Sequence, residues 1–376
     1  MEKIKILYVF GTNPLGGVGT YLKNIIKEID YNKFDISFLF FCEKIQDDFL
    51  KVANEHNCKI YCLKKFSLKN LVINLKNVNS ILKREKIHIL HVHSPNIASF
   101  IFFIAKKRGI KIRIVHSHSI KSSNTFFRRL RNKIVMLPLK REANYFFGCN
   151  RASIEKMFGK DIWKSNKTYI ARNGIRTNDF YFNREQRNEL RNKFNIDSNT
   201  IVIGHVGRFS KEKNHIFLIK LAQNLRKKNI SFKMVFIGDG ELFNSIKSTI
   251  QLNGLTEHIL LLGSIDNISF MYNMFDILLL PSTFEGSPLT IFESIANDLP
   301  MIISDKVPEE TESLYLVEKL PLDNIENWIE KIILLNRNKL DFHLSNVSDE
   351  FDIKKTIKSL EDKYIDYVKL EYEKNI

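Results

Sequence analysis

The apolar residues of the chain form short runs that alternate with longer amphipathic stretches. In the first half, strand-like runs occupy residues 4–10, 36–41, 59–63, 87–92, 111–116, 145–148 and 168–171. Helical periodicity marks the stretches near residues 19–29, 45–56, 68–85, 96–108, 125–141 and 151–158. Strands that alternate with helices are typical of βαβ units around a parallel sheet. Runs without polar alternation, such as residues 36–41, suit a sheet that is covered on both faces.

A second alternation of the same kind begins after about residue 195. Its strand-like runs are 201–206, 233–237, 258–262, 277–280 and 301–304, and its helical stretches lie near 214–228, 240–253, 267–274, 288–297 and 323–336. The polar segment 173–183 is the predicted linker. The pattern therefore predicts an α/β protein with two doubly wound, Rossmann-like domains that face a cleft. In open sheets of this kind, ligands bind at the carboxyl ends of the strands.

The expected domains are a Rossmann-like domain at residues 1–175, a second Rossmann-like domain at 176–350 and a C-terminal helix at 351–376. Within the last segment, apolar side chains recur at helical spacing, at Ile353, Ile357, Leu360, Tyr364 and Val368. Three turns are too few to favour a coiled coil. We expect this helix to pack across both domains.

Composition narrows the class of protein. The 376 residues suffice for two domains, and 44% are hydrophobic. No run approaches the ~20 apolar residues that span a bilayer. The N-terminus begins with a strand-like run and has no signal-peptide pattern, so we expect a cytoplasmic protein. The four cysteines lack zinc-site spacing and indicate scattered thiols in a reducing compartment.

Charge is distributed unevenly along the chain. Residues 1–175 contain 33 Lys and Arg against 12 Asp and Glu, a net charge of +21, whereas the remaining residues carry −5. A basic first half fits anionic lipid headgroups, a phosphate-bearing substrate or nucleic acid, although solvated lysines on an ordinary surface explain it equally well. The stretch 121–141 reads as a basic amphipathic helix, which favours the surface of an anionic membrane over a core-facing helix. Because no recognition module or aromatic platform accompanies the charge, we expect no nucleic-acid partner.

The segment 285–293 is the most informative candidate site. It contains Glu285, Gly286, Ser287, Pro288, Leu289, Thr290 and, one turn into the next helix, Glu293. Ser287 suits the N-cap of that helix and Pro288 its first position. The amides of Leu289 and Thr290 then lie at the positive end of the helix dipole, where anions bind. A phosphate receiver between two carboxylates is what a nucleotide-sugar requires.

Two further segments follow the first strand of each half. Arg208 and Lys213 come after the strand 201–206 and could neutralise a diphosphate, Arg by bidentate contacts and Lys as a point charge. Gly16 and Gly17 lie in a glycine-rich turn after the strand 4–10, where backbone can approach a ligand closely. That turn lacks the spacing of dinucleotide-binding and P-loop motifs. A tight turn before a helix explains it about as well.

Histidines gather at two strand ends, His88, His91 and His93 at one and His116 and His118 at the other. No carboxylate lies nearby in sequence, and packed or hydrogen-bonded roles are expected for His88 and His91. His118 follows its strand and should face the cleft, where it could hydrogen-bond a sugar hydroxyl or transfer a proton.

These segments together resemble the family 4 retaining glycosyltransferases of the two-domain GT-B architecture. The matching pieces are Gly16-Gly17, His118, Asn173-Gly174, Gly207-Arg208 with Lys213-Asn214, and the pair of glutamates eight residues apart at 285 and 293. They occur in the order of that family and cover nearly the whole chain. One departure is Arg176, because the family often has an acid at that place.

The resemblance implies transfer of a hexosyl group from a nucleotide diphosphate with retention at the anomeric carbon. It makes residues 1–175 the acceptor-binding domain and residues 176–350 the nucleotide-sugar-binding domain. It places Glu285 on the hydroxyls of the donor sugar, Glu293 on the ribose, and Arg208 and Lys213 on the diphosphate. It also places Gly16 and Gly17 on the phosphate side and His118 beside the transferred sugar. No Asp-x-Asp motif occurs in a site-like context, so we expect no essential metal and no cofactor, with cationic side chains and helix amides stabilising the leaving group.

The resulting hypothesis is a glycosyltransferase on the inner face of the cell membrane that extends a lipid-linked glycan in capsule, exopolysaccharide or lipopolysaccharide biosynthesis. The expected donor is a UDP-sugar. Two alternatives remain open on the same architecture. A nucleotide-sugar epimerase would convert the donor without any acceptor, and a non-catalytic nucleotide-sugar-binding protein would release no UDP.

Overall fold

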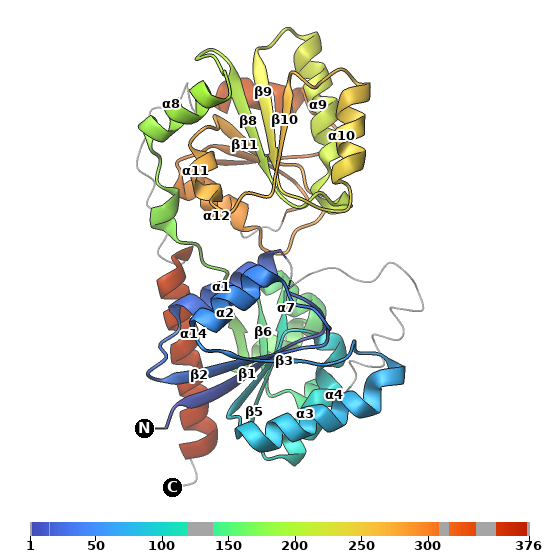
Figure 1. Cartoon of the computed structure of the whole chain (residues 1–376), viewed down its shortest axis with the longest axis vertical. Helices are drawn as coiled ribbons and strands as arrows, with labels where there is room; N and C mark the ends of the chain where they lie inside the picture. The colour runs from blue at the N-terminus through green and yellow to red at the C-terminus, as the bar shows by residue number, and fades with distance from the viewer. Residues whose placement is uncertain (1, 15, 119–137, 308–315, 336–350, 374–376) are drawn as a thin grey trace. The chain divides into compact units, whose positions relative to one another are not determined.

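The computed structural model describes residues 2–14, 16–118, 138–307, 316–335 and 351–373. The chain divides into two compact units (Figure 1). Unit 1 comprises residues 1–174 and 353–376, and unit 2 comprises residues 175–352. Most of the predicted membrane-binding stretch, residues 121–137, lies outside the described residues.

Unit 1 is built on a parallel sheet with the strand order β3-β2-β1-β4-β5-β6-β7. The strands are β1 (Ile4–Phe10), β2 (Phe34–Phe40), β3 (Lys59–Cys62), β4 (Ile89–Val92), β5 (Ile112–Ser117), β6 (Tyr145–Gly148) and β7 (Thr168–Ile170). The helices are α1 (Gly17–Glu28), α2 (Asp47–Glu55), α3 (Leu71–Glu85), α4 (Pro95–Lys107), α6 (Leu139–Glu142), α7 (Arg151–Phe158) and α14 (Ile353–Val368).

Alternation along β1 divides the core of unit 1 into two layers. Ile6, Tyr8 and Phe10 pack with α1, α2 and α14 on one face of the sheet. Leu7 and Val9 pack with α3, α4, α6 and α7 on the other. Because successive strand residues point to opposite faces, an unbroken apolar run is what a sheet covered on both faces requires.

Helix α14 is part of unit 1, whereas the sequence analysis set residues 351–376 apart as a C-terminal helix packed across both domains. Its apolar face joins the core layer of α1 and α2, through Ile353, Ile357 and Leu360. Polar contacts add to this packing: the Tyr364 hydroxyl lies 3.1 Å from that of Tyr8. The helix therefore supplies side chains to the interior of unit 1 from the far end of the chain. Figure 1 shows α14 beside α1.

Unit 2 repeats the same architecture, with the strand order β10-β9-β8-β11-β12-β13. Its strands are β8 (Ile201–Val206), β9 (Phe232–Ile237), β10 (Ile259–Gly263), β11 (Ile277–Leu280), β12 (Met301–Ser304) and β13 (Val317–Leu320). Its helices are α8 (Arg184–Lys193), α9 (His215–Lys227), α10 (Phe243–Leu252), α11 (Ile268–Tyr272), α12 (Leu289–Ala296) and α13 (Ile325–Leu335). Helices α9, α10 and α13 cover one face of the sheet, and α8, α11 and α12 cover the other.

The predicted Rossmann-like class is confirmed for both units. In each sheet the strand order reverses beside the first strand, between β1 and β4 in unit 1 and between β8 and β11 in unit 2. The carboxyl ends of the strands at such a reversal form the usual ligand-binding edge of open α/β sheets. Among the described residues, no helix combines the length and the apolar character needed to cross a bilayer.

Candidate functional site

The reversal point of unit 2 brings two predicted segments together. The loop after β8 contains Arg208 and Lys213, and the loop after β11 contains Glu285. Hydrogen bonds join these loops; among them, the Thr283 amide donates to the Glu212 carbonyl at 2.8 Å, and the Asn214 side-chain amide donates to the Pro281 carbonyl at 3.1 Å. The fold therefore places a lysine and a glutamate that are 72 residues apart at the same edge of the sheet.

Lys213 and Glu285 form an ion pair that is largely shielded from solvent. Lys213 Nζ lies 2.6 Å from Glu285 Oε1, and the two side chains are 18% and 11% exposed. The Ser282 hydroxyl donates to the same oxygen at 2.5 Å. A Cβ atom on Gly207 would lie 3.1 Å from Lys213 Cδ, so this glycine leaves room for the lysine side chain. The arrangement holds a charged carboxylate in a defined position.

Arg208 is paired differently. Its guanidinium lies 3.1 Å from Glu241 Oε2, and both side chains are more than half exposed. Exposed ion pairs contribute little to stability, so Arg208 can exchange this partner for a phosphate at small cost. The adjacent turn is a tight corner, because a Cβ on Gly240 would approach the Phe209 carbonyl oxygen to 2.6 Å.

Helix α12 begins one residue later than the sequence predicted. Leu289 is its first residue, and Pro288, with extended backbone angles, occupies the N-cap in place of Ser287. No side chain caps the helix. The amides of Leu289 and Thr290 stand at the first two helical positions, where no acceptor within the helix exists. The predicted helix start is therefore present, following directly on the turn that contains Gly286.

Glu293 lies one turn into α12, and its environment is less polar than that of Glu285. The Tyr272 hydroxyl donates to Glu293 Oε2 at 2.6 Å. Burial raises the pKa of the Glu293 carboxyl to about 7, and the Tyr272 hydrogen bond opposes that rise only in part. Glu293 consequently changes charge near neutral pH, which the sequence did not predict.

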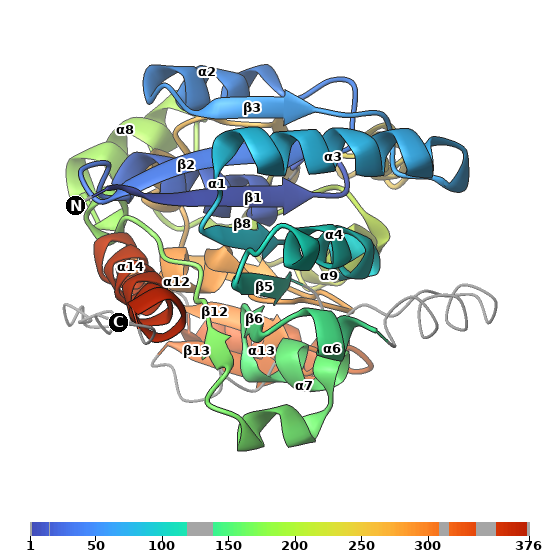
Figure 2. The same cartoon turned by 90° about the horizontal axis from the view of Figure 1, so that it is seen from below.

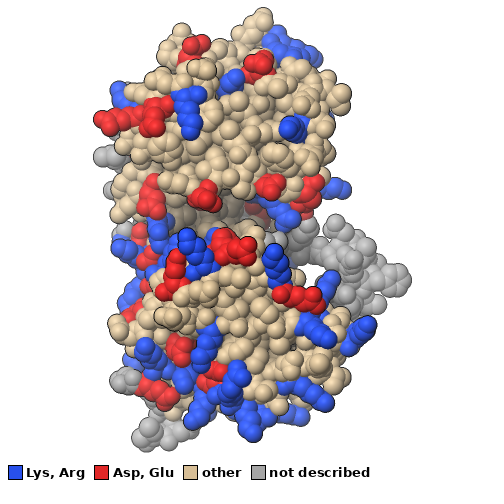
Figure 3. Space-filling view, viewed as in Figure 1, with Lys and Arg blue, Asp and Glu red and all other residues tan. Residues whose placement is uncertain are grey.

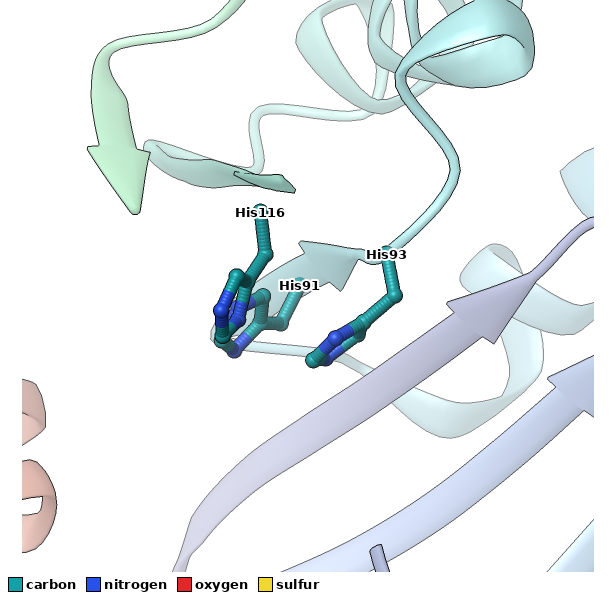
Figure 4. Close-up of side chains that lie close together, drawn as sticks. All are labelled: His91, His93 and His116. Atoms are coloured by element: carbon teal, nitrogen blue, oxygen red, sulfur yellow. The ribbon is translucent and has the colours of Figure 1, made fainter. Parts of the chain in front are cut away.

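The reversal point of unit 1 holds a group of four histidines. His91 and His93 come from the end of β4, and His116 and His118 come from the end of β5; the first three are seen together in Figure 4. Their rings stack at centroid distances of 4.0 Å for His116–His118 and 4.2 Å for His91–His93. Burial lowers the pKa of all four, that of His118 to about 4, so the rings are neutral at physiological pH.

Hydrogen bonds determine which nitrogen of each ring carries the proton. His93 Nδ1 lies 2.5 Å from His118 Nε2, and His93 Nε2 is buried without a partner among the described residues. An unpaired buried acceptor is better tolerated than an unpaired buried N–H group. His93 therefore donates from Nδ1 to His118, and His118 carries its own proton on Nδ1. In this tautomer His118 acts as a hydrogen-bond donor.

The same reasoning gives a second chain of hydrogen bonds. His116 Nε2 is also buried without a partner in the described part of the chain, so His116 donates from Nδ1 to His91 Nε2 at 3.2 Å. His91 then donates from Nδ1 to the Tyr364 hydroxyl at 2.7 Å. The packed, hydrogen-bonded role expected for His91 is confirmed. His88 is likewise engaged, since its Nδ1 accepts from the Lys5 amide at 2.9 Å.

The histidine group is poorly arranged for a metal ion in this conformation. His91, His93 and His116 bring ligand nitrogens within 4.8 Å of one another. However, the planes of His91 and His93 differ by only 23°, and those of His91 and His116 by 18°. An imidazole binds a metal along the nitrogen lone pair, in the plane of the ring. Stacked parallel rings cannot all direct lone pairs at one point, so a metal would require the rings to turn.

The glycines after β1 differ in what constrains them. A Cβ atom on Gly19 would lie 2.5 Å from the Pro14 carbonyl oxygen, so packing explains that glycine. Gly16 has φ of 59° and caps α1, which favours glycine through its backbone angle. Gly17 has neither constraint, since nothing lies within 4 Å of the position of its Cβ. Open space beside the start of a helix is consistent with the close approach of a ligand.

The fold is that of the GT-B-type glycosyltransferases, with two Rossmann-like units and, in this chain, a charged site at the switch point of the second. The family model described as "Glycosyl transferases group 1" matches residues 186–338, which lie within unit 2. This match and the curated relatives agree with the resemblance drawn from the motifs.

Two curated relatives align over most of the chain. "Putative glycosyltransferase EpsF" of Bacillus subtilis (strain 168) is 28% identical over 338 residues, covering 87% of this chain and 86% of the relative. "UDP-Gal:alpha-D-GlcNAc-diphosphoundecaprenol alpha-1,3-galactosyltransferase" of Escherichia coli is 25% identical over 391 residues, with 98% of each chain covered. Among solved structures, Anabaena Alr3699/HepE in complex with UDP matches with a TM-score of 0.76 at 18% identity, covering 97% of this chain and 100% of that one.

The structure also shows contacts that the sequence did not predict. Ser282 donates a hydrogen bond to Glu285, and Glu241 forms an ion pair with Arg208. Both contacts depend on the shapes of loops, which the sequence does not define. Tyr272 lies at an apolar position of a short helix, and no pattern marked its hydroxyl. For His93, the sequence offered one signal, its spacing of two residues from His91. This spacing indicates that the two side chains share a face of the sheet, but it does not identify a hydrogen-bond partner.

Proposed function

We propose that this protein transfers a hexosyl group, with retention of anomeric configuration, from a UDP-sugar to a lipid-linked glycan during the synthesis of a bacterial surface polysaccharide. Unit 2 binds the donor and unit 1 binds the acceptor. The protein acts in the cytoplasm at the inner face of the cell membrane. The names of the relatives support the proposal: that of the Escherichia coli protein specifies a UDP-sugar and a diphosphoundecaprenol-linked acceptor. The Anabaena structure was solved with UDP-glucose as well as with UDP.

One observation supports the donor site above all: the shielded Lys213–Glu285 pair stands at the switch point beside the start of α12. A neutral ligand would form no ionic contact with a lysine in this position. A nucleotide-sugar has both of the required parts, an anionic diphosphate for Lys213 and the helix amides, and sugar hydroxyls for the Glu285 carboxylate.

The proposed roles follow from the two kinds of ion pair. Arg208, released from Glu241, and Lys213 neutralise the diphosphate while it departs. The amides of Leu289 and Thr290 add fixed dipoles that need no rearrangement during the reaction. Glu293 accepts hydrogen bonds from the ribose hydroxyls in its ionised form. Gly16, Gly17 and His118 keep the roles that the resemblance implies, and the tautomer of His118 makes it a donor toward a sugar oxygen.

In the proposed reaction, the bond between C1 of the sugar and the diphosphate oxygen breaks. A hydroxyl of the acceptor attacks C1 from the same face, and its proton passes to the departing diphosphate, which leaves as UDP. The protein supplies position and charge, and the leaving group accepts the proton. We further propose that no metal ion is essential, because Arg208, Lys213 and the helix amides carry the charge-stabilising role. Activity that survives EDTA would agree with this, and activity restored only by a divalent ion would refute it.

The test is an assay for UDP release and for the sugar product, with donor alone and with donor plus an undecaprenyl-diphosphate-linked acceptor. The proposal predicts UDP and an elongated lipid only when both substrates are present. Glu285→Ala and Arg208→Ala should abolish transfer, whereas Glu241→Ala, which alters only the exposed partner of Arg208, should keep it. A new sugar formed from donor alone would indicate an epimerase, and UDP binding without any turnover would indicate a binding protein.

A further inference from the structure

A face of unit 1 formed by α3 and α4 exposes large apolar side chains. Leu68, in the single turn before α3, is 92% exposed, Val72 is 67% exposed and Phe103 on α4 is 52% exposed. The two helices pack side by side (Figure 2). Single exposed apolar residues are common on protein surfaces, but a contiguous group marks an interaction surface. We name this group, with its neighbour Ile73, the α3–α4 face.

The α3–α4 face adjoins a groove of about 700 Å³. Val72 and Leu75 of α3 line one side, and Phe100, Phe103 and Ile104 of α4 line the other. The inward residues of α4 already fill the core, since Ile101 and Phe102 are fully buried. Helix α4 is thus apolar beyond the face that packs into the core, and these additional apolar side chains border the groove.

Positive charge surrounds the face. In the described part of this region, residues 56–118 and 138–141, there are 15 Lys and Arg and a single acidic residue, Glu85. That carboxylate is already engaged, because Lys59 Nζ and Arg84 Nε each lie 2.7 Å from one of its oxygens. Glu142, at the groove, lies 3.6 Å from Lys106. The charge around the α3–α4 face is therefore almost entirely of one sign, and blue side chains border this part of unit 1 in Figure 3.

Basic side chains are interleaved with the apolar ones themselves. Lys69 follows Leu68 directly, Lys76 lines the groove, and all of these lysines are exposed. Lys107 Nζ lies 4.3 Å from the centre of the Phe103 ring, a cation–π contact at the edge of the apolar surface. An apolar centre with ammonium groups at its rim matches the boundary between acyl chains and anionic headgroups.

We propose that the α3–α4 face docks on a bilayer of anionic phospholipid. Leu68, Val72 and Phe103 enter the acyl boundary, while Lys69 and Lys107 contact headgroup phosphates. The inference rests on the proposed function, because a lipid-linked acceptor is presented at a membrane surface, and it identifies the surface that meets the membrane. A protein partner with an apolar helix is disfavoured, since it would need an acidic rim to match the lysines.

The test is co-sedimentation of the full chain with vesicles of phosphatidylglycerol and phosphatidylcholine, compared with phosphatidylcholine alone. We expect binding to the anionic vesicles that weakens at high salt. Leu68→Glu/Phe103→Glu should bind at least about tenfold more weakly. Leu252→Glu is the matched control, because Leu252 is 87% exposed on unit 2, and it should bind like the wild type. Equal binding by the double variant and the wild type would overturn the proposal.

A second variant tests the docking face without adding charge to an apolar position, so that weaker binding cannot be attributed to misfolding. Lys69→Gln/Lys107→Gln alters only exposed charge and should also weaken binding to anionic vesicles; unchanged binding would again overturn the proposal. Stabilisation by UDP should be the same in every variant, since none lies in unit 2's site. If no UDP-sugar or UDP stabilises the wild type while vesicle binding behaves as expected, the donor proposal fails and the docking face stands.

Discussion

The two units share one architecture, but the sheet edge at the switch point is charged in unit 2 and neutral in unit 1. In unit 2 the edge holds ions: a shielded Lys213–Glu285 pair and an exposed Arg208–Glu241 pair. In unit 1 it holds four neutral, stacked histidines, of which His116 and His91 form a hydrogen-bonded chain to Tyr364. The strand order does not decide this difference, since the first six strands of unit 1 and the six strands of unit 2 follow the same order. The few residues that follow each central strand decide what the edge can bind.

The contrast suggests that the two edges bind chemically different parts of the substrates. A charged edge suits a substrate part that carries charge, such as a diphosphate, and it must keep its own ions paired until that substrate arrives. A neutral edge of defined tautomers suits hydroxyl groups, which need directed donors and acceptors and no net charge. The predictions below test each side of this comparison, from the largest expected effect to the smallest.

Removing the lysine from the charged edge should have the largest effect. Lys213→Ala takes away a diphosphate contact and leaves the Glu285 carboxylate shielded and unpaired. We expect transfer to fall at least about 100-fold and the free energy of unfolding to fall by about 3 kcal/mol. Steady-state kinetics and urea denaturation measure these two quantities. The double variant Lys213→Ala/Glu285→Ala should recover part of the lost stability but none of the activity; no recovery would mean that the two charges are not coupled.

Acid should destabilise the neutral edge. The pKa of each of the four histidines is lowered in the folded chain, so below the ordinary value of about 6.5 the unfolded chain binds protons that the folded chain refuses. Stability is therefore present above about pH 6.5 and is lost as pH falls, by up to about 1.4 kcal/mol per pH unit for each histidine. Hydrogen exchange at pH 5 and pH 7 should show faster opening of β4 and β5 at the lower pH. Equal protection at both values would contradict the neutral state of the cluster.

Acid should also lower the stability of unit 2, though by less, because burial lowers the pKa of His205 and His215 as well. Acid should therefore loosen both units, unit 1 more steeply. Glu293 works in the opposite direction. Its pKa is raised, so the folded chain gains stability as pH falls from about 7 toward about 4.5. This opposing contribution belongs to unit 2 and sharpens the difference between the units.

Donor binding should depend on pH through Glu293. Ribose hydroxyls donate to an ionised carboxylate, and with a pKa of about 7 this group is mostly protonated at pH 6 and mostly ionised at pH 8. The affinity for UDP-glucose should therefore rise about tenfold between these values, measured by calorimetry. UDP-glucose is preferred to UDP as the probe because its diphosphate does not titrate in this range. Glu293→Gln should flatten the dependence, and a wild-type affinity that falls with rising pH would contradict the assignment.

The smallest effect is expected from the tautomer of His118. His93→Asn keeps a side-chain N–H donor near the place of Nδ1, whereas His93→Leu removes it. We expect kcat to fall about fivefold in the leucine variant and to be largely retained in the asparagine variant, with KM for the donor little changed. This corresponds to loss of one ordinary hydrogen bond, about 1 kcal/mol. If both variants behave alike in kcat, His93 has only a packing role.

Much of the fold follows from the apolar pattern. The bounds of β1, β6, β8, β11 and β12 agree with those predicted, because each strand is a mostly apolar run that ends near glycine, proline or a polar residue. Helix α8 was missed since its inward positions include Arg187 and Arg191, which are buried on Asp276 and do not produce apolar periodicity. The edge strand β13 was missed because it is short and only partly buried.

The candidate site was predictable where local chemistry defines it. A glycine turn, a proline and a following helix marked the start of α12, with an error of one residue at the N-cap. The lysine and both glutamates were visible as residues, but not their pairing, because contact between Lys213 and Glu285 depends on how β8 and β11 lie beside each other. The tautomers of the histidines also could not be predicted, since they depend on Tyr364, 273 residues away from His91.

The central claim is that Glu285 holds the sugar of a nucleotide-sugar while Lys213 holds its diphosphate. The most direct measurement is calorimetric affinity of Glu285→Gln for UDP-glucose and for UDP, with Glu241→Gln as control. The account predicts that Glu285→Gln binds UDP-glucose about tenfold more weakly than the wild type does and binds UDP about equally well. Unchanged affinity for UDP-glucose, or an equal loss for both ligands, would contradict it.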